Sequence, residues 1–176
     1  MKTPIPNSSI KISTVQPDDI APISRHYASE VKTGVATFDT NPPPLSYWDS
    51  KLSSAQSGLY PFLVATRIHA SGNEVGGWAA LSPYDTKSAY ERCAELSIYV
   101  LDNFQGQGLG RLLMNEMLKT LESHPFIHTL ISRIVPTQRA SIHLHLTAGF
   151  EFVGTMRQVG NKFGQVQDVS IYQYTA

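Results

Sequence analysis

The sequence predicts a single α/β domain built on one mixed sheet. Its 176 residues suit one domain of ordinary size with a substantial core. Segments with the alternation typical of strands are interleaved with segments of helical spacing. Their order is strand, helices, three strands, helix, strand, helix and strands. No linker is long enough to divide the chain, so we expect the strands to share one sheet.

The chain opens with a segment that lacks regular patterning. Residues 1–9 carry two prolines and polar side chains, which is typical of a flexible lead-in to a domain over 10–176. Ile10–Val15 then alternates between apolar and polar residues and predicts the first strand. Two acidic residues, Asp18 and Asp19, precede a run of helical spacing and indicate the start of a helix.

Prolines and turn residues divide the next part of the chain. Three consecutive prolines, Pro42–Pro44, exclude one regular element across residues 33–48. A short helix is expected over Ser46–Leu52. Phe62–Arg67 and Glu74–Leu81 predict two paired strands, because turn-forming residues separate them.

The second half predicts four strands and two helices. Leu96, Ile98 and Val100 alternate with polar or aromatic residues in its clearest strand, so these three side chains share one face. Gly149 follows the second helix and is expected to end it in the left-handed conformation. The strands are Ala94–Leu101, Leu130–Val135, Phe150–Val153 and Val169–Tyr174, and the helices are Leu109–Leu121 and Arg139–Thr147.

Composition excludes several classes of partner. Acidic and basic residues balance at 14 each, so the chain has no basic footprint for nucleic acid. No run approaches the roughly 18 apolar residues of a membrane span, and the first residues lack the apolar segment of a secretory signal. Cys93 is the single cysteine, which excludes an internal disulfide and favours a reducing, cytoplasmic setting.

The most informative stretch is a glycine loop, Gln105–Arg111, between a predicted strand and a predicted helix. Glycines let backbone amides approach a ligand closely, and the start of the helix offers free N–H groups to a pyrophosphate. A plain flexible turn is the alternative reading of such a loop taken alone. A Walker loop is excluded because Arg111 stands where that motif needs lysine and then a hydroxyl. The fingerprint of dinucleotide-binding folds is also excluded, because it has two residues between its second and third glycines. Here one residue separates each pair of neighbouring glycines.

The loop resembles the Gln/Arg-x-x-Gly-x-Gly/Ala motif of the GNAT superfamily of acetyltransferases. The strand Ala94–Val100 before the loop is similar to that family's strand, and Ala140–Phe150 resembles its last helix and exit. The phosphinothricin and methionine sulfoximine N-acetyltransferases are the most similar subfamily. Its marks here are Ala36–Phe38, Gly77–Ala79, Ala89–Tyr90, Glu95 and the run Val159–Asp168. The similarity extends from about Ile10 to Tyr174.

This resemblance implies a single-domain GNAT fold, with a mixed, mostly antiparallel sheet flanked by helices. It also implies acetyl-CoA as co-substrate, no metal, a small-molecule amine as acceptor and a homodimer. The residues expected to bind acetyl-CoA lie on the strand, the loop and the last helix. They are Ile98, Tyr99, Val100, Gln105, Gly106, Gln107, Gly108, Leu109, Gly110, Arg111, Gln138 and Ser141.

Two residues are candidates for proton transfer. An acceptor amine must lose a proton before it attacks a thioester, and the Glu95 carboxylate is a suitable base. The matching glutamate is the family's proposed base, whereas a salt-bridged acid at the end of a strand is the plainer reading. His145 stands where many relatives have a tyrosine that protonates the CoA thiolate, and a histidine can do the same. A structural, hydrogen-bonded His145 is the alternative. Cys93 is expected to be an inert thiol.

The acceptor side is where the chain departs from the subfamily. Phe38, Lys87 and Tyr90 are the expected substrate contacts, with Phe38 beside the proline-rich loop and Lys87 binding an acceptor carboxylate. Relatives often have arginines where Asp85 and Lys87 stand, and Arg-Trp where Gln165 and Val166 stand. On the cofactor side, Gln138 replaces the usual asparagine.

Three functions follow from these features. The first is transfer of an acetyl group from acetyl-CoA to the primary amine of an amino acid or amino-acid analogue. The second is a catalytically weak GNAT module that binds CoA without turnover, against which the presence of Glu95 argues. The third is a protein N-terminal acetyltransferase, which would need an open groove for a peptide.

Overall fold

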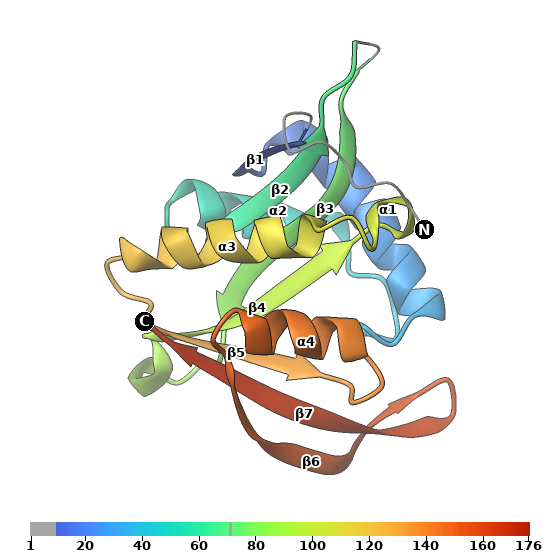
Figure 1. The fold of residues 1–176 in the computed structure, drawn as a ribbon, viewed down its shortest axis with the longest axis vertical. Helices are drawn as coiled ribbons and strands as arrows, with labels where there is room; N and C mark the ends of the chain where they lie inside the picture. Colours follow the sequence, from blue (N-terminus) through green and yellow to red (C-terminus); the bar gives the residue numbers. More distant parts are fainter. Residues whose placement is uncertain (1–9, 71) are drawn as a thin grey trace.

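The protein folds around one seven-stranded sheet with the order β1-β2-β3-β4-β5-β7-β6 (Figure 1). The computed structural model describes residues 10–70 and 72–176, so the predicted lead-in over 1–9 lies outside the described residues. Every neighbouring pair of strands is antiparallel except β4 and β5. This confirms the expected mixed, mostly antiparallel sheet. The strands are β1 (Ile10–Thr14), β2 (Phe62–Arg67), β3 (Glu74–Pro83), β4 (Cys93–Val100), β5 (Thr129–Ile134), β6 (Glu151–Lys162) and β7 (Gln165–Thr175).

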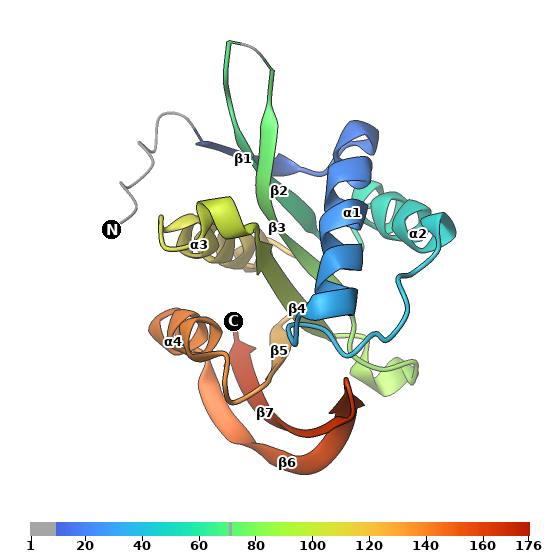
Figure 2. The same ribbon diagram turned by 90° about the vertical axis from the view of Figure 1, so that its right-hand side faces the viewer.

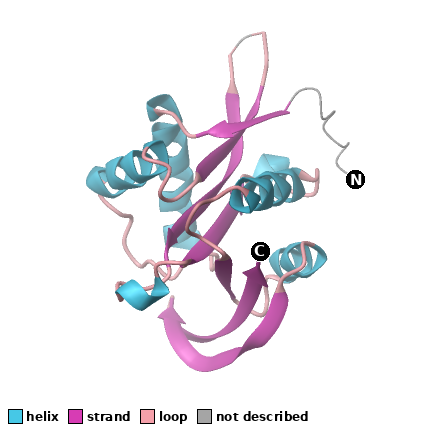
Figure 3. Ribbon diagram, turned by 90° about the vertical axis from the view of Figure 1, so that its left-hand side faces the viewer, coloured by secondary structure: helices cyan, strands magenta, loops and turns pink. Residues whose placement is uncertain are grey.

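Helices cover both faces of this sheet, two on each side (Figure 2). Helices α1 (Pro17–Thr33) and α2 (Leu45–Gln56) lie on one face, and α3 (Leu109–Glu122) and α4 (Arg139–Thr147) lie on the other. The same layers are seen from the opposite side in Figure 3, where the long β6–β7 hairpin curves below the helices. In the described part of the chain, no helix is long and apolar enough to span a membrane.

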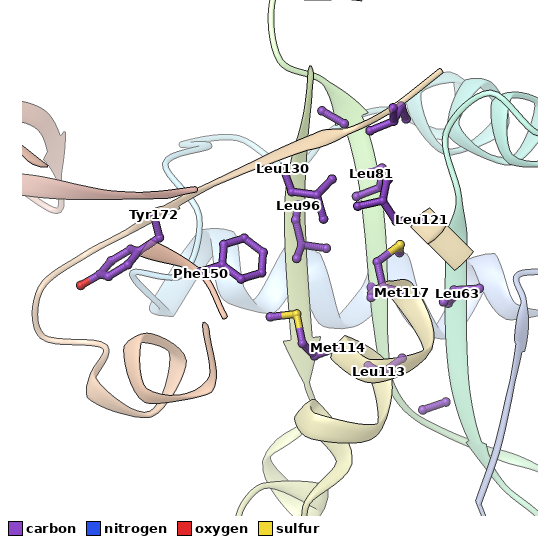
Figure 4. Packing of buried hydrophobic residues seen from close by; sticks show 14 of the residues in the cluster. Leu63, Leu81, Leu96, Leu113, Met114, Met117, Leu121, Leu130, Phe150 and Tyr172 are labelled. Carbon is purple, nitrogen blue, oxygen red and sulfur yellow. The ribbon is translucent and has the colours of Figure 1, made fainter. Parts of the chain in front are cut away.

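Each face of the sheet has its own hydrophobic cluster, because strand side chains alternate between the two faces. Leu81 and Leu96 point toward α3, whose Leu113 and Met117 are fully buried against them (Figure 4). Trp78 points the other way and is buried against α1 and α2. The helical spacing of the apolar residues in α3 therefore matches the face that the sheet offers.

The β6–β7 hairpin differs most from the sequence prediction. Only Phe150–Val153 and Val169–Tyr174 were expected as strands, whereas the two strands run to a two-residue turn at Phe163 and Gly164. Both turn residues have positive φ, of 56° and 73°, as a tight hairpin turn requires. Most of β6 is exposed on both faces, and two irregularities interrupt its register. A strand without a buried face shows no alternation in the sequence.

The other elements lie close to their expected bounds. Phe62–Arg67 and Arg139–Thr147 match the predicted elements at both ends, and Gly149 has the expected positive φ of 91°. The predicted helix over Ser46–Leu52 is longer, because α2 continues through a polar final turn to Gln56.

The one parallel pair of strands in the described sheet, β4 with β5, separates soon after it forms. Strand β4 pairs with β5 through Cys93–Glu95 and Thr129–Ile131, and the remaining residues of β4 have no partner on that side in the described sheet. The buried Ser132 hydroxyl donates to the Leu96 carbonyl at 3.3 Å, at the point where the ladder ends. The two strands then diverge and leave a gap in the middle of the sheet.

Candidate functional site

Two cavities meet where β4 and β5 diverge. One, of about 760 Å³, lies between the ends of β4 and β5, the segment after α1 and the β6–β7 hairpin, and is called the acceptor cavity below. The other, of about 860 Å³, follows the glycine loop between α3 and α4 and is called the loop groove. The two cavities adjoin each other, because five residues line both. These shared residues are Ala36, Ile98, Tyr99, Gln138 and Ser141.

The glycine loop leaves open space at the start of α3. Gly106 and Gly108 have positive φ values of 74° and 84°, and Gly108 is the residue that precedes the helix. A Cβ atom at either position would meet no other atom of the described chain within 4 Å, apart from the chain neighbours. The first turn of the helix therefore presents its N–H groups to an open groove, which suits an anion such as a pyrophosphate.

Side chains of the loop stabilise its conformation. Gln105 donates from Nε2 to the Val100 carbonyl at 3.2 Å and to Asp102 at 3.0 Å. Gln107 turns away from the groove, because its side chain donates to the Asn103 carbonyl at 2.5 Å. Eleven of the twelve residues expected to bind the cofactor line the groove, and Gln107 does not. The eleven are Ile98, Tyr99, Val100, Gln105, Gly106, Gly108, Leu109, Gly110, Arg111, Gln138 and Ser141.

Glu95 lies in the acceptor cavity and is held by Arg133 of β5. Arg133 Nε donates to one carboxylate oxygen at 2.7 Å, and Nη2 donates to the other, so the contact is two-pronged. The Glu95 carboxylate raises the pKa of Arg133, which keeps the guanidinium charged. An ionised carboxylate has about four lone-pair sites. The guanidinium takes two of them, so Glu95 keeps acceptor sites for an incoming amine or water.

A lysine that the sequence did not single out lies close to Glu95. Ser82 faces Glu95 across the β3–β4 ladder, and its hydroxyl accepts a hydrogen bond from Lys51 Nζ at 2.6 Å. Burial lowers the pKa of Lys51 to about 8, although the Glu95 charge acts in the opposite direction. Tyr47 lines the cavity nearby, and burial followed by the charges of Asp39 and Glu95 raises its pKa to about 12.

His145 reaches the acceptor cavity from α4 and is 3% exposed. Its Nδ1 lies 2.8 Å from the Ser141 carbonyl oxygen, which can only accept, so the bond assigns the proton to Nδ1. Nε2 then carries a lone pair, and it is buried without a hydrogen-bond partner among the described residues. Burial lowers the pKa of His145, because desolvation disfavours the imidazolium. In this state His145 accepts a proton at Nε2 and has none to donate there.

The β6–β7 hairpin closes the far wall of the acceptor cavity. Lys162, 2% exposed, donates from Nζ to the Thr37 carbonyl at 2.5 Å and to the Glu30 carbonyl at 3.3 Å. Phe38 also lines the cavity, and its ring lies so close to Gly160 that a Cβ atom there would clash with it. These contacts of Gly160 and Lys162 therefore hold the β6–β7 hairpin against the segment after α1, which contains Phe38.

The two other expected substrate contacts lie outside both cavities. Lys87 and Tyr90 are exposed on the loop between β3 and β4, where the backbone N–H of Lys87 donates to Asp85 at 2.9 Å.

Arg133 and Lys51 were not predicted as site residues from the sequence. Arg133 supplies a positive charge inside the acceptor cavity. The only signal for Arg133 in the sequence is that it is the one charged residue of its strand. Its nearness to Glu95 depends on the parallel pairing of β4 with β5.

Comparison with known proteins matches the chain to a family of enzymes. Residues 28–150 match the acetyltransferase (GNAT) family. The chain is 36% identical to a phosphinothricin N-acetyltransferase from Streptomyces coelicolor, over 89% of this chain and 90% of that protein. It is 31% identical to an L-methionine sulfoximine/L-methionine sulfone acetyltransferase from Pseudomonas aeruginosa, over 88% of each chain.

A solved structure has the same fold along nearly the whole chain. The phosphinothricin acetyltransferase from Sinorhizobium meliloti, in complex with acetyl-CoA, superposes with a TM-score of 0.84. It is 29% identical in sequence, and the alignment covers 95% of this chain and 88% of that one.

The environment of Lys51 predicts a pH-dependent effect on stability. The pKa of Lys51 is about 8 in the folded protein, against the ordinary 10.5 that applies when the chain is unfolded. The unfolded state therefore binds more protons between these values, and the contribution of Lys51 to stability improves as pH rises through this window. Lys51→Met removes the titrating group. The melting temperature of wild type should therefore rise relative to that of Lys51→Met between pH 7.5 and 10, as measured by differential scanning calorimetry. A difference that stays constant over this range would show that Lys51 has an ordinary pKa.

Proposed function

Because the chain belongs to the acetyltransferase (GNAT) family, we propose that its acceptor is the primary amine of a small molecule, an amino acid or an amino-acid analogue. The chain is an acetyl-CoA-dependent N-acetyltransferase. The observation that carries the proposal is that two cavities, one over the open glycine loop and one that contains the Glu95 carboxylate, adjoin where β4 and β5 diverge. The named activities of the relatives, on phosphinothricin and methionine sulfoximine, support an acceptor of this size.

In the proposed binding mode, the pyrophosphate of acetyl-CoA lies over Gly106 and Gly108 at the start of α3. The unpaired edge of β4 at Ile98–Val100 pairs with the pantetheine amides like an added strand, since it lacks a neighbouring strand on that side. Gln138 and Ser141 line both cavities, which supports their proposed contact with acetyl-CoA next to the acceptor. Acetyl-CoA supplies an acetyl group that is already activated as a thioester.

The proposed reaction is direct attack of the amine on the thioester, without an acyl-enzyme. Holding the two reactants together supplies up to about 7–11 kcal/mol of the barrier reduction. Glu95 takes the proton of the ammonium group, directly or through one water, through the acceptor sites that Arg133 leaves free. Backbone amides near Val100 polarise the thioester carbonyl.

His145 is proposed to protonate the departing CoA thiolate. In the tautomer set by Ser141, its Nε2 lone pair must first receive a proton. We infer that it takes the second proton of the attacking amine, as the nitrogen becomes an amide, and passes it to the sulfur. The unpartnered Nε2 supports this shuttle, since it leaves a free proton-acceptor site on a residue that lines the acceptor cavity.

The binding site predicts that a side chain on the glycine loop blocks the cofactor. Gly108→Val places a branched side chain in the open space at the helix start and removes contacts to the pyrophosphate. The affinity for CoA should fall by about 10- to 100-fold or more, as measured by calorimetry. Gly58→Val is the matched control, because Gly58 has a similar φ of 76° and similar free space but lies outside both cavities. Unchanged CoA affinity in a folded Gly108→Val variant would overturn the site assignment.

The role of Glu95 predicts a selective loss of turnover. Glu95→Gln keeps the shape and one acceptor oxygen for Arg133 but cannot take a proton. Turnover should fall by roughly 10²–10⁴-fold with little change in CoA binding. The exposed Glu122 of α3 offers a control substitution, Glu122→Gln, that should leave the rate unchanged. Full activity of Glu95→Gln at every pH would contradict the assignment, as would stable acetyl on Cys93 detected by mass spectrometry.

We also propose that the protein is a homodimer. Strand β6 is an edge of the sheet and exposes apolar side chains, including Phe152 and Val153, which are 56% and 58% exposed. Apolar groups gathered on an open edge favour association. Sedimentation equilibrium at micromolar concentrations should give twice the 19.4 kDa chain mass, and Phe152→Asp should shift the protein toward the monomer. A wild-type protein that sediments as a monomer would contradict this proposal.

A further inference from the structure

Arg133 is the only lysine or arginine, among the described residues, that lines the acceptor cavity. The other charged groups in the lining are the carboxylates Glu95 and Asp39, and the Asp39 carboxylate accepts a hydrogen bond from Tyr27 at 2.7 Å. Lys162 is buried behind the wall, where carbonyl oxygens bind its ammonium group. Any anionic group on the acceptor therefore has a single cation to bind within this cavity.

From this arrangement we propose that Arg133 binds the α-carboxylate of an amino-acid acceptor and so determines the specificity of the enzyme. The inference rests on the proposed function and extends it by naming the carboxylate anchor. The bond between Arg133 and Glu95 places a guanidinium directly beside the base. An α-amino acid carries its ammonium and carboxylate groups on one carbon atom. Arg133 and Glu95 are thus complementary to such a substrate: the substrate carboxylate binds Arg133, and the substrate ammonium group binds Glu95.

The guanidinium retains the donors that this contact needs. A guanidinium has five N–H groups, and Glu95 uses one on Nε and one on Nη2. Nη1 makes no hydrogen bond to other described residues, so its edge remains available to an incoming carboxylate. The Arg133 side chain is 52% exposed, against 20% for Glu95, so the guanidinium is accessible from the cavity mouth. Arginine suits this role because its planar fork matches a carboxylate.

The proposed contact also separates free amino acids from peptides. The first residue of a peptide has its carboxyl group in an amide bond, so it brings no negative charge beside the amine. Lys87, which sequence analysis favoured as the carboxylate contact, lies outside the cavity lining. Arg133, in contrast, contacts Glu95 directly, so the substrate carboxylate and the reacting amine bind next to each other.

The test compares L-methionine sulfone with its carboxamide at saturating acetyl-CoA, with the rate of CoA thiol release as readout. Wild type should show the lower KM for the free acid. Arg133→Met should raise the KM for the acid by about 10- to 100-fold, the loss expected for a charge-assisted hydrogen bond. The KM for the carboxamide should change far less, and Arg133→Lys should recover part of the affinity for the acid. Arg25→Met is the control, because Arg25 is exposed on α1 outside both cavities.

Two results would overturn the proposal. One is a wild-type enzyme that uses the acid and the carboxamide equally well or prefers a peptide N-terminus. The other is an Arg133→Met variant that raises both KM values by the same factor. Circular dichroism would check that the variants fold. If Arg133→Met does not fold, the KM values of wild type and Arg133→Lys for the acid and the carboxamide provide the test. Failure of the underlying function is distinguishable, because it would appear in wild type as no transfer to any amine and no binding of CoA.

Discussion

The loop groove and the acceptor cavity both depend on the early separation of β4 from β5. Only three residues of each strand pair, and the Ser132 hydroxyl then binds the Leu96 carbonyl where the ladder stops. An unpaired strand in the middle of a sheet exposes backbone donors and acceptors that need partners. In this family the acetyl-CoA co-substrate is proposed to supply them. The loop groove and the acceptor cavity adjoin at this gap, and the proposed reaction brings the amine and the thioester together there.

Charges around this gap are placed by elements far apart in the sequence. Glu95 comes from β4, Arg133 from β5 and Lys51 from α2. The Glu95 carboxylate binds Arg133 directly, and its charge also acts on the pKa of Lys51. Burial lowers the pKa of Lys51, and pairing with Glu95 raises the pKa of Arg133, so the two cations behave differently near neutral pH. The proposed base, Glu95, therefore has beside it one cation that stays charged, Arg133, and one whose pKa is lowered by burial, Lys51.

The β6–β7 hairpin links the C-terminal part of the chain to the loop after α1. Lys162 is buried with its ammonium group on two carbonyl oxygens, and Phe38 lies against Gly160. Because a buried ammonium group is costly without partners, these contacts restrict where the hairpin can lie. The wall of the acceptor cavity is thus set by packing between segments more than a hundred residues apart.

Local sequence patterns predicted most of the fold and located the glycine loop of the proposed cofactor site. Helical spacing in α3 and alternation in β4 are local patterns, and the glycine loop between them is contiguous, so each was readable without a structure. The long hairpin was missed because most of β6 is exposed and two irregularities interrupt its register, so its sequence shows no regular alternation. Only the tertiary structure placed Arg133 beside Glu95, moved Lys87 and Tyr90 out of the cavity and assigned the proton of His145. Those features depend on strand pairing, loop path and burial, and such contacts between distant residues leave no periodic signal along the chain.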